Sequence, residues 1–250
     1  MKLTILGCGT SGGVPRVDGF WGAADPTNPK NRRKRASVMV EEGDTTLLID
    51  TSPDLREQLL TNNVSKIDAV LYTHDHADHT HGIDDLRFLA FSMGQKIPIY
   101  GNQETLDILK QRFGYIFESK DGYPAICDAH LIEKQKNFGT ISVTKFDQRH
   151  GNNISLGYRF GDIAYSTDLN QLTDEAIEAL KGVKVWVVDA LRYEPHQTHS
   201  HVSQTLEWID LIKPERAILT HMAWEIDYET LKSECPSNVE PAYDGLQIEI

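Results

Sequence analysis

Three histidines and an aspartate lie within six positions of this chain, at His74, His76, Asp78 and His79. They follow an apolar run at residues 68–72, which predicts a strand leading into a tight loop. In such a loop His74 and His76 can point at one centre, while Asp78 and His79 turn toward a second. Imidazoles with a carboxylate suit Zn²⁺, Mn²⁺ or Fe, and two centres suit two ions. The segment therefore predicts a metal site in preference to a His-rich surface loop.

Length and composition predict one α/β domain over residues 1–250. The chain has 250 residues and 40% hydrophobic content, which is enough for one large core. No apolar stretch approaches the ~20 residues that span a bilayer, so we expect no membrane partner. The three cysteines are scattered and odd in number, which favours reduced thiols and a cytoplasmic location.

The net charge of the chain limits the kinds of molecule that it is expected to bind. The formal net charge of −12 disfavours binding of extended nucleic acid. One local exception is residues 30–35, where five of six side chains are basic. This run is either a solvated loop or a basic wall beside an anionic substrate.

Strand-like and helix-like runs alternate along the chain, which predicts a layered α/β architecture. Helices are expected at residues 54–60, 174–180 and 204–212, with Thr173 and Ser203 as N-caps of the last two. Strands are expected at residues 2–6, 37–41, 45–49, 69–72, 97–100, 141–146, 155–160, 163–166, 183–188, 217–219 and 246–250.

Polar side chains of metal-ligating type recur where expected strands end. Because loops at strand ends of a rigid sheet are where α/β proteins build their sites, we expect these side chains to converge. The residues are Asp50, His74, His150, Asp168, Asp189 and His221.

This ordered set resembles the ligand set of the metallo-β-lactamase superfamily. The resemblance covers nearly the whole chain and implies a four-layer αββα sandwich that binds two metals. It implies a first metal on His74, His76 and His150. It implies a second metal on Asp78, His79 and His221, with Asp168 bridging the two and Asp50 as a support.

Further features are similar to the phosphodiesterase branch of that superfamily. They are the Gly-rich segment at residues 7–15 and His199, an extra histidine ahead of a helix. The chain most resembles the phosphoribosyl 1,2-cyclic phosphate phosphodiesterases of phosphonate breakdown, and more distantly the tRNA 3′-processing endonucleases. Residues 19–25 lack the cysteines of a structural zinc loop, so we expect no third metal. No long RNA-clamping arm is present, which favours a small phosphodiester.

The resemblance implies a dinuclear hydrolase with Zn or Mn that cleaves a cyclic or linear phosphodiester, phosphoribosyl or nucleotide-like. A hydroxide bridging the metals would attack phosphorus, oriented by Asp78. His199 would protonate the leaving group, with His201 and then His196 as alternatives. Arg35 and the turn Ser11, Gly12 and Gly13 are expected to bind the phosphate.

Other activities of the superfamily stay open at this point. A thioester or lactone hydrolase would use the same hydroxide without needing His199, and an RNA 3′-processing nuclease would share the motifs. β-Lactamases generally lack a histidine at the position of His79, which disfavours antibiotic hydrolysis. A homodimer is possible on the sequence.

Overall fold

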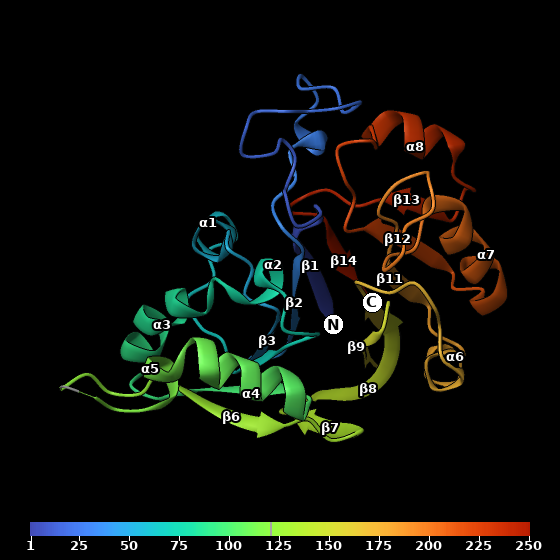
Figure 1. Ribbon diagram of the computed structural model, residues 1–250. Coiled ribbons are helices and arrows are strands. Elements are labelled where there is room, and N and C mark those ends of the chain that lie inside the picture. The colour runs from blue at the N-terminus through green and yellow to red at the C-terminus, as the bar shows by residue number, and fades with distance from the viewer. Residues whose placement is uncertain (121) are drawn as a thin grey trace.

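Two seven-stranded sheets pack face to face, with helices on their outer surfaces. The structure, a computed structural model, describes residues 1–120 and 122–250. Figure 1 shows the first sheet with α1 to α5 on one side of the molecule, and the second sheet with α6 to α8 on the other. This is the αββα arrangement expected from the sequence.

The first sheet mixes antiparallel and parallel strands. Pairing is antiparallel from β14 to β3 and parallel from β3 to β6. In spatial order the strands are β14 (Gln247–Glu249), β1 (Lys2–Gly7), β2 (Ser37–Glu42), β3 (Thr45–Ile49), β4 (Ala69–Leu71), β5 (Ile97–Gly101) and β6 (Cys127–Leu131).

The second sheet is built in the same mixed way. Pairing is parallel from β13 to β10 and antiparallel from β10 to β7. In spatial order the strands are β13 (Val239–Pro241), β12 (Arg216–Thr220), β11 (Val185–Asp189), β10 (Ile163–Ser166), β9 (Asn153–Phe160), β8 (Ile141–His150) and β7 (Gln135–Phe138).

Alternating side chains assign the two faces of the first sheet to different cores. Val38 and Val40 of β2 pack in the core that also holds Phe146 and Trp186 of the second sheet. Met39, between them, packs in the core formed with α1, α3 and α4. Successive residues of a strand point to opposite faces, so one short strand contributes to both layers.

The helices are short and lie between or after strands. Their bounds are α1 (Leu55–Thr61), α2 (Ala77–Thr80), α3 (Leu86–Met93), α4 (Gln103–Arg112), α5 (Gly114–Phe117), α6 (Asp174–Leu180), α7 (Val202–Ile212) and α8 (Tyr228–Glu234), with 3₁₀ turns η1 (Pro29–Asn31) and η2 (Ile83–Asp85). None of the helices in the described part of the chain combines the length and apolar character needed to cross a membrane.

The expected strands are present, and the differences lie elsewhere. Thr173 caps α6 through its side chain, which accepts from the backbone N–H of Ala176. Ser203 does not cap α7: that helix begins at Val202 with His201 as the capping residue, so Ser203 lies in its first turn. Strands β6, β7 and β13 and helices α2 to α5 and α8 were not expected from the sequence, because short edge strands and one- or two-turn helices have weak periodicity.

Candidate metal centre

Three residues of the centre leave their strands in a backbone conformation that L-residues rarely adopt. Asp50, Asp168 and His221 have φ angles of 65°, 52° and 59°. Asp50 and His221 directly follow β3 and β12, and Asp168 lies two residues after β10. A non-glycine residue in the left-handed region costs about 1 kcal/mol or more. The surrounding sheet holds this strained turn three times, and each time it delivers a charged or imidazole side chain to the same place.

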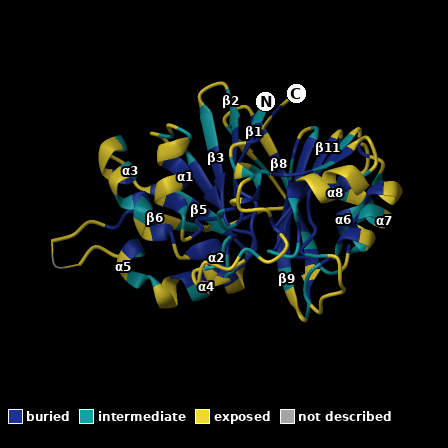
Figure 2. Ribbon diagram, turned by 90° about the horizontal axis from the view of Figure 1, so that it is seen from above, coloured by how far each residue is buried: buried dark blue, intermediate teal, exposed yellow. Residues whose placement is uncertain are grey.

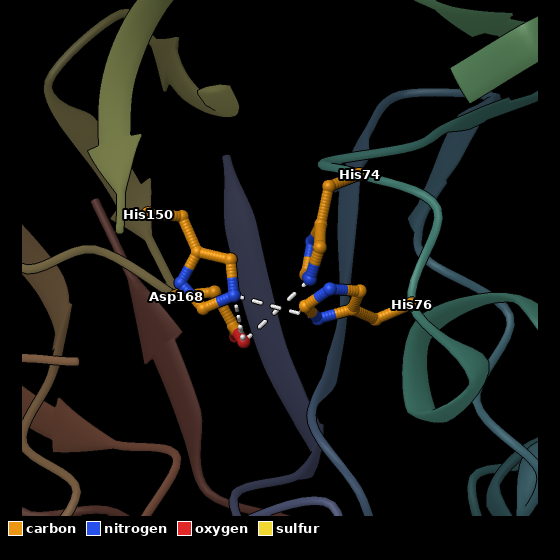
Figure 3. A group of neighbouring side chains, drawn as sticks. All are labelled: His74, His76, His150 and Asp168. Atoms are coloured by element: carbon orange, nitrogen blue, oxygen red, sulfur yellow. Dashed lines mark hydrogen bonds and ion pairs between the residues drawn. The ribbon is translucent and has the colours of Figure 1, made fainter. Parts of the chain in front are cut away.

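One cluster joins side chains from both halves of the molecule. Figure 3 shows His74 and His76, which follow β4, facing His150 at the end of β8 and Asp168 after β10. Their ligand atoms lie within 4.8 Å of one another. The Nε2 atom of His150 is 3.4 Å from Nδ1 of His76, and the Nε2 atom of His74 is 3.6 Å from Oδ2 of Asp168. The arrangement offers three imidazole nitrogens and one carboxylate oxygen to a single point.

A second cluster shares Asp168 and uses its other oxygen. The Oδ1 atom of Asp168 lies 3.2 Å from Nε2 of His79 and 3.3 Å from Nε2 of His221. Asp78 completes the group, with Oδ2 3.3 Å from Nε2 of His79. Asp168 therefore presents Oδ2 to the first cluster and Oδ1 to the second, as a bridging carboxylate would.

Unpartnered buried nitrogens test whether these clusters fit a cation. The Nε2 atoms of His74, His79 and His221 are buried and have no hydrogen-bond partner. A buried polar atom without a partner is costly, and such atoms are normally satisfied. Three such nitrogens converge on the oxygens of Asp168, and lone pairs of that kind suit a divalent cation. The donor set therefore fits a divalent metal site.

Neighbouring groups hold the histidine rings in place. Asp50 is fully buried and accepts from Nδ1 of His79 at 2.7 Å, and also from the backbone N–H and hydroxyl of Thr73. Nδ1 of His150 lies 2.8 Å from the carbonyl of Thr198. A bond at Nδ1 sets the tautomer and leaves Nε2 free for a metal. The supporting roles of Thr73 and Thr198 were not foreseen, although Thr73 directly precedes the motif.

Electrostatic interactions shift the pKa values of the carboxylate of Asp168 and the imidazole of His79 in opposite directions. Burial by itself raises the pKa of Asp168, but His221, His79 and other imidazoles outweigh it and hold that pKa well below its ordinary value. Burial likewise lowers the pKa of His79, and the carboxylates around it, first Asp168 and Asp78, raise it well above the ordinary value. A cation at this point would take the place of the proton on His79.

His199 lies against the clusters without belonging to the two that share Asp168. Its Nδ1 is 2.9 Å from Oδ2 of Asp189, its Nε2 is 3.7 Å from Oδ2 of Asp168, and its ring stacks on His221 at 4.9 Å. Burial lowers the pKa of His199, but the carboxylates of Asp189 and Asp168 outweigh it and raise the pKa to about 9. His201 caps α7, and the exposed His196 lies on the loop, with its ring 5.2 Å from that of His199. Geometry therefore favours His199 over the two alternatives.

The expected phosphate-binding residues lie beside the centre. Gly9 forms backbone bridges with both Arg35 and Met222, and Met222 follows His221. A Cβ atom at Gly13 would lie 3.6 Å from Cδ of Arg35, so the turn and the arginine lie side by side. Ser11 is exposed at the tip of that turn, and Gly12 lies between Ser11 and Gly13.

The basic run at residues 30–35 does not act as one surface. Arg33 is only 2% exposed and donates to the carbonyls of Ala223 and Ile226. Lys30 lies over the ring of Tyr228 at 4.3 Å. The idea of a continuous basic wall is therefore wrong for Arg33, which is buried against a neighbouring segment, while Lys30 is partly exposed and lies on Tyr228.

Comparisons with known proteins agree with the fold. The family model described as "Beta-lactamase superfamily domain" matches residues 45–222. A solved diphosphatase of the PhnP family is 36% identical, with a TM-score of 0.91, and the match covers 100% of this chain and 97% of that one. The short form of human tRNase Z is 19% identical, with a TM-score of 0.71 and coverage of 100% and 99%, which shows a shared fold.

A curated relative is longer than this chain. An octanoyltransferase of Porphyromonas gingivalis is 31% identical over 254 residues, which are 99% of this chain and 51% of that protein. The chain spans about half the length, or less, of the curated relatives it matches. With the matched family domain and the likeness to the diphosphatase, the chain belongs to the beta-lactamase superfamily.

Proposed function

We propose that this protein is a phosphoric diester hydrolase that cleaves a small cyclic or linear phosphodiester with two divalent cations, Zn²⁺ or Mn²⁺. The observation that carries the proposal is Asp168, which presents one oxygen to each of two histidine clusters. The likeness to a PhnP-family diphosphatase supports phosphorus chemistry. Phosphoribosyl cyclic phosphates and nucleotide-like esters are the proposed substrates.

The chain would hold its two cations with separate sets of side chains. His74, His76 and His150 would hold one cation, and Asp78, His79 and His221 the other, with Asp168 shared. Five imidazoles favour Zn²⁺, and two carboxylates allow Mn²⁺. Such a pair of cations lowers the pKa of water toward ~7 and offsets charge on phosphate oxygens.

The residues around the clusters supply the remaining steps. Asp78 would orient the attacking water through a carboxylate oxygen. His199, protonated at neutral pH because Asp189 and Asp168 raise its pKa to about 9, would donate the Nε2 proton to the leaving oxygen. Asp189 holds the ring through Nδ1, so that Nε2 faces Asp168.

The Gly-rich turn and one arginine would bind the phosphate of the substrate. Backbone N–H groups of Ser11 and Gly12 and the guanidinium of Arg35 would contact the non-bridging oxygens, while the N–H of Gly13 closes the turn onto the carbonyl of Thr10. Asp54 lies 3.0 Å from Nε of Arg35, which leaves the Nη groups of the guanidinium for the substrate.

The test is a comparison of substrate classes with protein loaded with Zn²⁺ or Mn²⁺. We expect hydrolysis of bis-p-nitrophenyl phosphate and of phosphoribosyl 1,2-cyclic phosphate. An octanoyl thioester, chosen because of the longer octanoyltransferase relative, should react far more slowly. Thioester hydrolysis without diester hydrolysis would overturn the proposal.

A further inference from the structure

Aromatic and arginine side chains gather on the N-terminal loop beside the metal centre. The guanidinium carbon of Arg16 lies 4.9 Å from the ring centroid of Phe20 and 5.1 Å from that of Trp224. We call Arg16, Phe20 and Trp224 the aromatic ledge. Figure 1 shows this loop in blue at the top of the view, near α8.

The aromatic ledge adjoins both the metal centre and the phosphate-binding turn. Trp224 is three residues beyond His221. The loop is tied to this segment by hydrogen bonds from Thr10 N to the carbonyl of Met222, at 3.2 Å, and from Ala23 N to the carbonyl of Trp224, at 2.9 Å. A Cβ atom at Gly12 would lie 3.5 Å from the Trp224 ring. A substrate bound at the Gly-rich turn would therefore have the ledge next to it.

Charge pairing favours a stacking surface over a second anion site at the ledge. The donors on one edge of the Arg16 guanidinium bind the carboxylate of Asp18, with Nε to Oδ1 at 3.1 Å. This pairing offsets the charge of Arg16 and leaves its planar face on the two rings. Phe20 is 47% exposed, and Trp224 is partly exposed. Flat rings and a guanidinium plane bind other flat rings, including every nucleobase.

We infer that the aromatic ledge receives the base of the substrate, which makes the substrate class a phosphodiester carrying a nucleoside. The inference rests on the proposed function and adds Trp224 and Phe20 as residues that determine specificity. The net charge of −12 favours a free nucleotide ester over an extended nucleic acid.

Two cyclic diesters that differ only in the base provide the test. Adenosine 2′,3′-cyclic phosphate and methyl riboside 2′,3′-cyclic phosphate share the ribose and the reacting ring. Trp224→Ala in the metal-loaded protein should lower kcat/KM for the adenosine ester by about tenfold or more, mainly through KM. The base-free ester should change little, and Trp224→Phe should restore most of the loss.

Controls separate stacking from structural support. Phe20→Ala, on an exposed loop, should act in the same direction if Trp224→Ala proves unstable. Phe88→Ala removes a ring that is 77% exposed on α3 and should leave both esters unaffected. Metal content and Tm are measured for each variant.

The outcomes distinguish the two levels of inference. Equal losses on both esters, or no loss on either, would overturn the base-binding role. A wild-type protein inactive on both esters counts against the proposed function. In that case binding of adenosine 2′-monophosphate, expected to weaken about tenfold in Trp224→Ala, still tests the ledge. A higher kcat/KM for a short oligoribonucleotide than for the adenosine ester would overturn the assignment to a free nucleotide.

Discussion

Replacing Asp189 with Asn should lower the pKa of His199, the proposed proton donor. Asp189 is fully buried, and its Oδ2 lies 2.9 Å from Nδ1 of His199. The rise in the pKa of His199 from 6.5 to about 9 corresponds to roughly 3 kcal/mol in favour of the protonated ring. This is a balance between burial, which lowers the pKa, and carboxylates, of which Asp189 contributes most. Without that charge the pKa of His199 should fall, although Asp168 and Asp78 still raise it against the effect of burial.

The direction in which activity changes with pH follows because the protonated form of His199 would be the proton donor. Activity that needs protonated His199 is present below its pKa and is lost as the pH rises through that value. The wild-type alkaline limb should lie at or below about pH 9, because bound cations add positive charge. In Asp189→Asn the same limb should move to lower pH by about one unit or more.

The assay measures kcat between about pH 5.5 and 10 on a diester with a poor leaving group. His199→Ala gives the loss of kcat expected when the proposed proton donor is absent. We expect a loss of ~10²–10⁴-fold on that diester and a smaller loss on a diester that releases p-nitrophenolate. Asp162→Asn, an exposed aspartate paired with Lys184, is the matched control. Metal content must be unchanged in each variant. An alkaline limb at the same pH in the wild type and in Asp189→Asn would refute the reasoning.

Three further outcomes concern the metals. Asp168→Ala should reduce bound metal from the proposed two ions per chain toward none, measured by elemental analysis, because both clusters use this carboxylate. Retention of both ions would contradict the bridging role. Asp50→Asn should weaken metal affinity by about 10–100-fold in a competition titration with a chelator, since Asp50 orients His79; unchanged affinity would remove that support. Metal affinity should fall as the pH falls, because Asp168 and Asp78 raise the pKa of His79 and a proton then competes with the cation. Calorimetry in buffers of different ionisation enthalpy should show that metal binding releases protons. Binding without proton release would contradict this.

Much of the fold and half of the centre are determined locally. His74, His76, Asp78 and His79 lie in one short segment after a strand, so their proximity needs no knowledge of the tertiary structure. The buried strands are equally visible, because apolar runs between turn residues specify them. Short helices such as α2 and edge strands such as β6 lack such periodicity, and their positions depend on what they pack against.

Other features were decided only when distant segments packed together. Asp168 divides its two oxygens between clusters because β10 places it between the loop after β4 and the end of β12. His199 and His201 are indistinguishable in sequence, but only His199 reaches Asp189. Arg33 looks like its basic neighbours, yet it is buried by segments about 190 residues away. Sequence specifies which side chains can do chemistry, and packing selects which of them meet, because contacts between distant segments depend on strand order and loop path.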